Sequence, residues 1–156
     1  MAGRIDARLT ELGIALPTPA VPIATYVPFV RFGDLVVVSG QVPTQDGVIR
    51  YTGLVGEAID VPTAIVAARL AFINVLAQLR LACDGDLDRV ARVVRLGGFV
   101  AARATFTDHA TVMNGASDLS VEVFGEIGRH ARSTIGVPSL PRDASVEVEG
   151  MFQLLF

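Results

Sequence analysis

The sequence contains one cysteine, Cys83, and this scarcity excludes an internal disulfide framework. A chain that folds without disulfides suits a reducing compartment, so we expect a cytoplasmic protein. The N-terminal residues Met-Ala-Gly-Arg-Ile-Asp-Ala-Arg contain no apolar stretch of signal-peptide length. Cys83 ends an apolar helical stripe, which is typical of a buried and unreactive thiol.

No uninterrupted apolar run reaches the length of a membrane span. The best candidate segment is interrupted by Arg69, Asn74, Gln78 and Arg80, so we expect no membrane partner. The net charge is −3, the pI is near 5.3, and no basic run is interleaved with aromatic residues. These features argue against a nucleic-acid partner.

Signatures of cofactors and metals are also missing. There is no Gly-x-Gly-x-x-Gly and no phosphate-binding loop. Residues 84–88 begin like a calcium loop, but Arg89 and Arg95 occupy the positions that require glycine and a bidentate glutamate. His109 and His130 have no cysteine or histidine at zinc-ligand spacing. We therefore expect neither a metal site nor an organic cofactor.

The sequence does have the composition of one folded domain, which we assign to residues 1–156. Hydrophobic residues make up 51% and charged residues 19%, which is enough to bury a core and predicts little disorder. Part of the apolar surface is expected to be buried between subunits. Residues 3–12 have helical spacing before Gly13, so we interpret residues 1–19 as an N-terminal helical extension. A proline-rich connector over 16–22 overlaps its end.

The next pattern is that of a β-hairpin followed by a helix. We expect the hairpin over 29–39, turning at Gly33-Asp34, with an arm at 35–38 that is apolar enough to be covered on both faces. Residues 44–60 are expected to form a loop. Pro62 suits the first turn of a long helix that ends near Cys83.

The second half of the chain predicts a strand, a helix and two closing strands. Residues 90–102 form the expected strand, with a bulge at Gly97-Gly98. Asp108 is a candidate cap for a helix that ends near Gly128.

The last quarter of the chain carries the candidate chemistry. Strand alternation places Arg132 and Thr134 on one face, and it places Glu147 and Glu149 on the face opposite Val146 and Val148. An arginine fork can hold a carboxylate in two hydrogen bonds, and a nearby glutamate can act on water as a general base. The plainer readings are that both glutamates are solvated and that Arg132 is a structural ion-pair partner.

A serine nucleophile is not favoured by the same alternation. His130 and Ser133 would form the candidate pair, but they lack an evident third group to orient the histidine.

Several motifs occur in an order that resembles the RidA/YjgF family of enamine and imine deaminases, formerly called the endoribonuclease L-PSP family. They are Tyr26, Val38-Ser-Gly-Gln-Val-Pro43, Asn74, Asn114, Arg132, Leu140-Pro-Arg-Asp143 and Val146-Glu-Val-Glu149. The resemblance covers roughly residues 20 to 155. It implies an α+β, chorismate-mutase-like fold, in which two helices pack on one face of a mixed β-sheet. It also implies a homotrimer whose sheets form a central barrel, with sites at the subunit clefts.

The resemblance also implies roles for individual residues. Arg132 matches the arginine that holds the substrate carboxylate, and Glu147 matches the carboxylate that activates water. The substrate-binding residues that it implies are Tyr26, Ser39, Gly40, Asn114 and Thr134. An alternative interpretation of Tyr26 is an aromatic residue that only packs in a subunit interface. We interpret Asn74 as a buried hydrogen-bonding residue of the helix. Thr134 stands where the family usually has cysteine, and the longer 114–132 interval indicates a divergent branch.

The function implied is hydrolysis of 2-imino or enamine acids to 2-oxo acids and ammonia, with a small carboxylate-bearing metabolite as the partner. A noncatalytic trimer that binds 2-oxo acids is the first alternative, because it would need only Arg132. A ribonuclease is the second alternative, and the acidic chain disfavours it.

Overall fold

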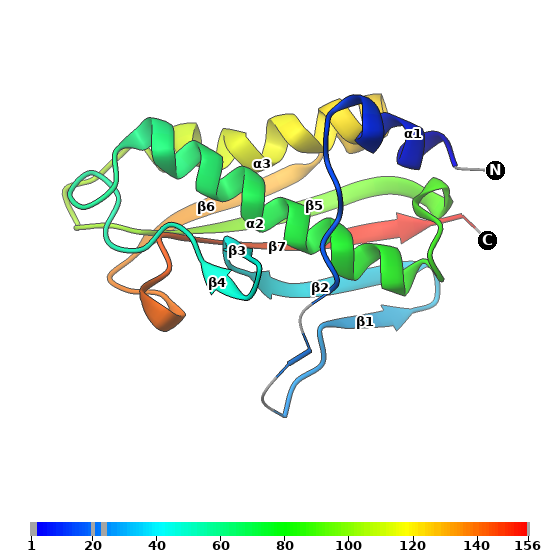
Figure 1. The fold of residues 1–156 in the computed structure, drawn as a ribbon, viewed down its shortest axis with the longest axis horizontal. Coiled ribbons are helices and arrows are strands. Elements are labelled where there is room, and N and C mark those ends of the chain that lie inside the picture. The colour runs from blue at the N-terminus through cyan, green and yellow to red at the C-terminus, as the bar shows by residue number, and fades with distance from the viewer. Residues whose placement is uncertain (1–2, 20, 23–24, 156) are drawn as a thin grey trace.

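The computed structural model describes residues 3–19, 21–22 and 25–155 of the chain (Figure 1). Within them, the helices and strands follow one another in an α+β order. The helices are α1 (Arg4–Glu11), α2 (Val61–Ala82) and α3 (His109–Phe124). The strands are β1 (Phe29–Phe32), β2 (Leu35–Gln41), β3 (Thr44–Gln45), β4 (Val48–Ile49), β5 (Val90–Ala101), β6 (Ala131–Val137) and β7 (Val146–Leu154).

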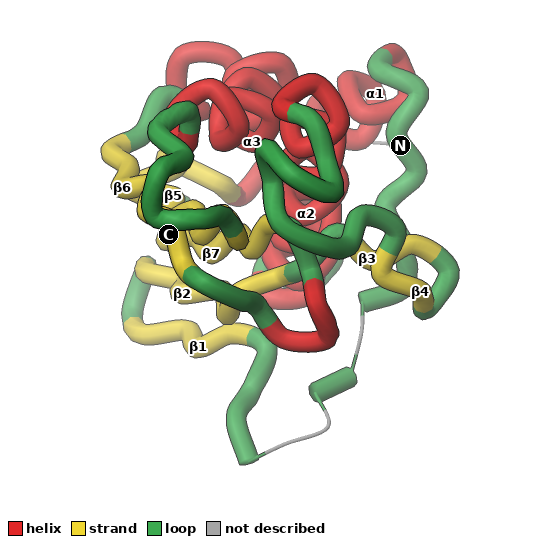
Figure 2. The backbone as a smooth tube through the Cα atoms, turned by 90° about the vertical axis from the view of Figure 1, so that its left-hand side faces the viewer, coloured by secondary structure: helices red, strands yellow, loops and turns green. Residues whose placement is uncertain are grey.

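Five strands form one mixed sheet in the order β1-β2-β7-β5-β6. The pairs β1–β2, β2–β7 and β7–β5 are antiparallel, and β5 pairs with β6 in parallel. Helices α2 and α3 form a layer over one face, which is clear when the molecule is viewed from its end (Figures 1 and 2). The expected mixed sheet with two helices on one face is therefore confirmed.

The core lies between the sheet and helix α2. The Asp60 side chain accepts a hydrogen bond from the Thr63 backbone N–H at 2.9 Å and so caps this helix, which places Pro62 in the first turn as predicted. Val146 and Val148 are fully buried beneath the helices, as the alternation of β7 predicts.

Helix α2 is also the one helix among the described residues that is long and apolar enough to cross a membrane. Inside the protein, however, 56% of that apolar stretch is buried, and α2 packs on β2, β7 and α3. Its composition is explained by its place at the centre of the core.

The local predictions for the first half of the chain largely agree with the structure. The hairpin turns at Gly33, whose φ of 61° favours glycine, and α1 ends before Gly13, whose φ is 69°. The expected loop over 44–60 was wrong in part, because β3 and β4 pair there as a small hairpin. Asp46 and Gly47 both have positive φ, as a tight two-residue turn requires. The predicted connector 16–22 includes residue 20, which lies outside the described residues.

The bulge predicted at Gly97-Gly98 was wrong. The irregularities of β5 lie instead between Val90 and Arg92 and between Val93 and Arg95. The two glycines serve close packing: a Cβ at Gly97 would lie 2.6 Å from Glu149 Oε1, and one at Gly98 would lie 2.5 Å from Met113 Sδ. Glycine signalled a close approach here, which sequence cannot distinguish from a bulge.

The predicted cap and end of α3 were right only in part. Asp108 stands at the capping position, but its side chain bonds no backbone N–H of the helix. The α-helix stops at Phe124, and residues Gly125–Gly128 continue as a 3₁₀ turn after Gly125 adopts a φ of 66°.

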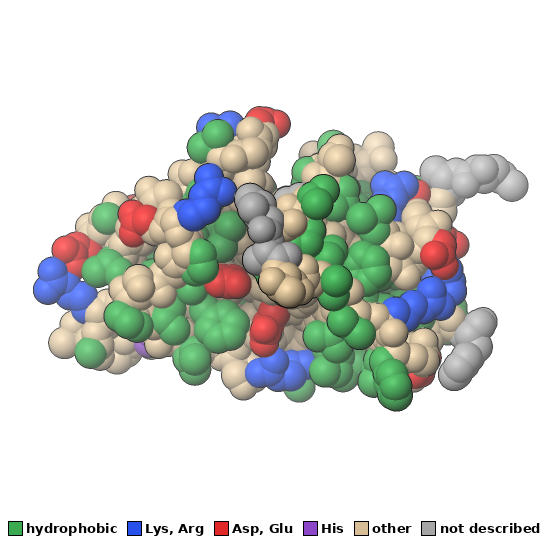
Figure 3. Space-filling model, turned by 90° about the horizontal axis from the view of Figure 1, so that it is seen from below, with side chains coloured by type: hydrophobic (Ala, Val, Ile, Leu, Met, Phe, Trp, Pro, Cys, Tyr) green, Lys and Arg blue, Asp and Glu red, His purple; other side chains and the backbone are tan. Residues whose placement is uncertain are grey.

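One face of the sheet carries no helix among the described residues of a single chain. The arm 35–38 was expected to be covered on both faces, but Val36 and Val38 are buried while Val37 is 46% exposed. Val30, Phe32 and Ile135 are also exposed, and register places these side chains with Val37 on the side away from the helices. We call this surface the open face. Figure 3 shows hydrophobic side chains spread over this side of the molecule, broken by a few carboxylates.

Gly115 sets the distance between the two core helices, which gives a test of this packing. A Cβ there would lie 2.0 Å from the Ile65 carbonyl oxygen. Helix propensity alone would favour Gly115→Ala by roughly 1 kcal/mol. We expect the substitution instead to lower the free energy of unfolding by about 1–3 kcal/mol, because α2 must move. Denaturant unfolding measures this.

The matched control is Asp118→Ala, at an exposed position on the same helix. It should change stability by less than about 0.5 kcal/mol. A Gly115→Ala protein as stable as this control would contradict the close helix approach.

Candidate functional site

The seven residues predicted from the sequence fall into two groups. Arg132, Thr134 and Asn114 lie between β6 and α3 on the helix-covered face. Tyr26, Ser39, Gly40 and Glu147 lie around β2 and β7.

The Arg132 side chain is held by helix α3. Its Nη1 donates to Asn114 Oδ1 at 2.9 Å and to Ser117 Oγ at 3.0 Å, and its Nη2 donates to the Ala110 carbonyl oxygen at 3.3 Å. Asn114 and Ser117 are three residues apart, so they share one face of the helix. Asn114 and Arg132, which the family resemblance both assigns to the site, are thus in contact. Ser117 is an additional contact that the spacing of motifs did not indicate.

The positive charge of Arg132 has no acidic partner among the described residues. All thirteen basic residues of the chain are arginines, and nine of them form ion pairs with Asp or Glu. The three groups that accept from Arg132 are instead neutral oxygens. An arginine that is fixed in place but not neutralised is suited to an anionic ligand.

Thr134 follows Arg132 on the same face of β6. It pairs with Gly98 of β5, whose missing side chain leaves room for Met113. The Thr134 Oγ1 atom is buried and has no hydrogen-bond partner among the described residues. Buried hydroxyls are usually paired, so this one is a candidate contact for a ligand or for water beside Arg132.

A histidine completes this side of the site. His130 Nε2 lies 2.9 Å from Ser117 Oγ, and its Nδ1 lies 2.7 Å from the Gly128 carbonyl oxygen. Burial lowers the pKa of His130, the nearby Arg132 charge lowers it further, and the bond to Gly128 opposes both. The sequence had suggested a pair of His130 with Ser133, which strand alternation disfavoured. The actual partner is on α3, which spacing along the strand cannot reveal.

Glu147 lies against the backbone of β2 at Gly40. A Cβ on Gly40 would lie 2.0 Å from Glu147 Oε1, so a residue with a side chain could not occupy this position without displacing the carboxylate. The β2–β7 register shifts between Val38 and Gln41, which places the glycine at an irregularity of the strand. The glycine at position 40 is thus explained by the glutamate packed against it.

The two glutamates of β7 have different surroundings. Glu149 forms an ion pair with Arg95 at 3.4 Å. For Glu147, no donor is found among the described residues. Burial raises the pKa of Glu147, and repulsion from Glu149 adds to this effect. A carboxyl group with a raised pKa is better suited to move protons near neutral pH.

Tyr26 and Ser39 lie at the same end of the sheet. Ser39 Oγ donates to the Val27 carbonyl oxygen at 2.7 Å, and the Ser39 N–H donates to the Pro28 carbonyl oxygen at 2.9 Å. These bonds hold the segment that carries Tyr26, whose side chain is 56% exposed. Asn74 supports the segment that follows β2, since its Nδ2 donates to the Val42 and Thr44 carbonyl oxygens.

One chain cannot bring Arg132 and Glu147 together. Arg132 pairs with Leu96 of β5, a buried residue of the helix-covered face, and its side chain reaches α3. Glu147 lies between Val146 and Val148, which face the helices, so its side chain points to the open face. The sheet itself separates the two groups.

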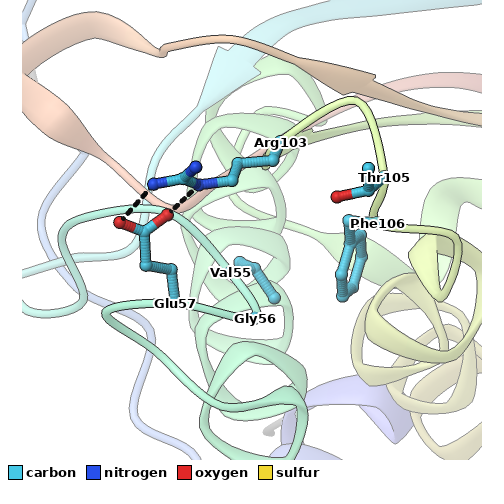
Figure 4. Close-up of a pocket in the computed structure, with 6 residues that line it drawn as sticks. All are labelled: Val55, Gly56, Glu57, Arg103, Thr105 and Phe106. Atoms are coloured by element: carbon cyan, nitrogen blue, oxygen red, sulfur yellow. Dashed lines mark hydrogen bonds and ion pairs between the residues drawn. The ribbon is translucent and has the colours of Figure 1, made fainter.

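Two surface pockets lie elsewhere. One, of about 510 Å³, is lined by Val55, Gly56, Glu57, Arg103, Thr105 and Phe106 (Figure 4). The other, of about 320 Å³, shares Arg103 and Phe106 and includes His109 and Gly136. Arg103 donates two parallel hydrogen bonds to the Glu57 carboxylate, so the charge of that arginine is already neutralised. None of the seven predicted residues lines either pocket. Among the described residues, no group of three or more His, Cys, Asp and Glu side chains could hold a metal ion.

The fold and these residues define a YjgF-type α+β domain, and comparison with known proteins identifies its family. The family described as "YjgF/chorismate mutase-like, putative endoribonuclease" matches residues 6–153. The chain therefore belongs to the YjgF/Rid family, which confirms the resemblance of the motifs. It is 46% identical to protein TCP17 of Trypanosoma cruzi, over 98% of this chain and 96% of that protein.

Solved structures agree with this assignment. Atu1372 of Agrobacterium tumefaciens, of unknown function, is 47% identical over 97% of this chain and 92% of its own, with a TM-score of 0.91. A "putative endoribonuclease" of Shewanella oneidensis is 34% identical over 97% of this chain and 100% of its own, with a TM-score of 0.93. The YjgF protein of E. coli shares the fold at 25% identity over 87% of this chain and 93% of its own, with a TM-score of 0.60.

The raised pKa of Glu147 gives a prediction about stability. Ionising this carboxyl costs more in the folded chain than in the unfolded one, so the cost is present at neutral pH and disappears as pH falls below about 4. We expect Glu147→Gln to raise the melting temperature at pH 7 and to raise it less at pH 4. Thermal unfolding at both pH values measures this.

The matched control is Glu149→Gln, which breaks the ion pair with Arg95 and should not stabilise the protein. A Glu147→Gln protein no more stable than wild type at pH 7 would contradict the raised pKa.

Proposed function

We propose that this protein hydrolyses 2-imino or enamine acids to 2-oxo acids and ammonia. The observation that carries the proposal is Arg132: its guanidinium is fixed by three hydrogen bonds that it donates to neutral oxygens, and its charge has no acidic partner among the described residues. Such a group favours a small ligand with a carboxylate, bound through two parallel hydrogen bonds.

Glu147 is the proposed general base. Its carboxylate has no donor among the described residues, and its pKa is raised by burial and by Glu149. Both features favour a group that takes a proton from water and then returns it. Gly40 and Ser39 would line the space beside it, with Tyr26 at the mouth.

The site is proposed to form between two copies of the chain. Arg132 and Glu147 face opposite sides of the sheet in one chain, so a site that uses both needs an Arg132 from one copy and a Glu147 from another. The open face offers apolar surface for such contacts, since Phe32 is 82% exposed and Val30 is 53% exposed. A homotrimer with a barrel of three sheets and three equal sites, close to three times 16.5 kDa, is the proposed assembly.

The proposed chemistry needs no cofactor, because a protonated imine is already electrophilic. Arg132 holds the substrate carboxylate and fixes the imine carbon. Glu147 accepts a proton from water as the water oxygen bonds to that carbon. Glu147 then returns that proton to the nitrogen of the adduct, the carbon–nitrogen bond breaks and ammonia leaves, and Glu147 accepts the hydroxyl proton as the carbonyl of the 2-oxo acid forms. We place this activity in the cytoplasm, in keeping with the single, buried cysteine.

A noncatalytic carrier or sensor of 2-oxo acids is the second candidate. It is favoured by the fact that all three contacts to Arg132 come from its own chain, so that capture of an anion does not require Glu147. Ammonia release from 2-iminopropanoate, generated in solution, distinguishes the two functions.

Two substitutions test the separate roles. Arg132→Lys keeps the charge but loses the planar fork, so we expect kcat/KM to fall by about 10- to 100-fold, mainly through KM. Glu147→Gln keeps the shape but cannot accept a proton, so kcat should fall by about 100-fold or more with a smaller change in KM. Steady-state imine hydrolysis measures both. Wild-type kinetics in either variant would remove that residue from the mechanism.

Mixing two inactive variants tests the shared site. Arg132→Ala and Glu147→Gln, co-expressed in equal amounts, should give mixed trimers in which about a quarter of the sites join an intact Arg132 to an intact Glu147. We expect the mixture to recover activity toward that fraction of the wild-type rate, while each variant alone stays inactive. The double variant, mixed with wild type, is the control for dilution. No recovery in mixed trimers would mean that the two residues do not share a site between chains.

A further inference from the structure

A chain of hydrogen bonds runs behind Arg132 and ends at the backbone of the turn before β6. Arg132 Nη1 donates to Ser117 Oγ at 3.0 Å, Ser117 Oγ lies 2.9 Å from His130 Nε2, and His130 Nδ1 lies 2.7 Å from the Gly128 carbonyl oxygen. Ser117 and His130 come from α3 and from the start of β6, so this chain links the helix layer to the edge of the sheet.

The donors and acceptors fix one arrangement of hydrogens for a neutral histidine. The Gly128 carbonyl can only accept, so His130 Nδ1 carries the hydrogen and Nε2 has a lone pair. Arginine can only donate, so the Ser117 hydroxyl uses its own hydrogen toward His130 and a lone pair toward Arg132. Each donor in the chain therefore has an acceptor in the next group.

We propose that Ser117 and His130 are positioning residues that orient the Arg132 fork for a substrate carboxylate. This proposal rests on the proposed function, in which Arg132 binds that carboxylate. Ser117 and Asn114 occupy both hydrogens of Nη1, and Ala110 takes one hydrogen of Nη2. Arg132 Nε donates no hydrogen bond among the described residues, and Nη2 donates one. We assign the ligand to the side of the guanidinium formed by Nε and Nη2, where two parallel N–H groups match one planar carboxylate.

The same contacts couple carboxylate binding to a proton on His130. Among the described residues, Arg132 on β6 is the charged group that acts on the ring, while α3 presents the Ser117 hydroxyl and the turn presents the Gly128 carbonyl. A protonated Nε2 can still donate to Ser117 Oγ, whose two lone pairs then accept from both cations. The second positive charge attracts the ligand carboxylate, so its affinity rises as pH falls through the pKa of His130.

Calorimetric binding of 2-oxobutanoate to the full-length oligomer tests whether Ser117 positions Arg132 for the ligand. We expect Ser117→Ala to weaken binding by about 10-fold, because a charged donor loses its acceptor, and Ser117→Thr to recover most of the loss because it keeps the hydroxyl. In imine hydrolysis, Ser117→Ala should raise KM more than it lowers kcat.

Substitutions of His130 test whether protonation of this side chain strengthens carboxylate binding. His130→Gln keeps an acceptor for the Ser117 hydroxyl but cannot become charged, so it should retain more affinity than His130→Ala. As pH falls from about 7.5 to below the pKa of His130, which burial lowers from its ordinary value, wild-type affinity should rise severalfold, whereas the affinity of His130→Gln should stay level over the same range.

The outcomes separate this inference from the proposed function. If Arg132→Ala abolishes binding but Ser117→Ala does not weaken it, the positioning role of Ser117 is wrong, whereas the role of Arg132 in binding the carboxylate stands. Equal losses in Ser117→Ala and Ser117→Thr, or equal pH dependence in wild type and His130→Gln, would also overturn the positioning role. Undiminished binding in Arg132→Ala would overturn the proposed function itself.

Discussion

The position of β5 between β7 and β6 is the constraint on which the site depends. Successive side chains of a strand alternate between the two faces of a sheet, and paired residues share a face. Because β5 pairs with both neighbours, the register assigns Arg132 to the face of Leu96 and Glu147 to the face of Phe99. The parallel β5–β6 pair requires a long crossover, which α3 supplies. That crossover passes directly over Arg132 and provides all three of its acceptors.

The faces of the sheet also differ in how their charges are neutralised. On the open face, Glu149 pairs with Arg95, which leaves Glu147 as the carboxylate without a donor among the described residues. On the covered face, Arg132 is held by neutral oxygens, although most arginines of the chain are paired with carboxylates. The chain thus has one fixed positive group and one partly buried negative group, each without an opposite charge beside it. An unpaired, partly buried charge is costly to a fold, and this favours a functional explanation for both.

The sequence was sufficient to predict the elements whose signal is local. The hairpin at Gly33-Asp34, the helix that starts after Asp60 and the alternation in β7 follow from turn chemistry and periodicity. The short β3–β4 pair was missed because two residues give no alternation to detect. The supposed bulge at Gly97-Gly98 failed because a glycine that makes room for Glu149 leaves the same mark in a sequence as one that bends a strand.

The candidate site could likewise be predicted only in part from the sequence. The family motifs supplied the candidate site residues, and the structure places two of them, Arg132 and Asn114, in contact. Periodicity could not reveal that Ser117 lies between Arg132 and His130, because the three are joined by the packing of α3 on β6. It could not reveal the exposure of Val37 either, since an apolar run has the same sequence whether a helix or a second chain covers it. In the proposed assembly, a second copy would cover the open face and would also bring its Arg132 to the Glu147 of this chain.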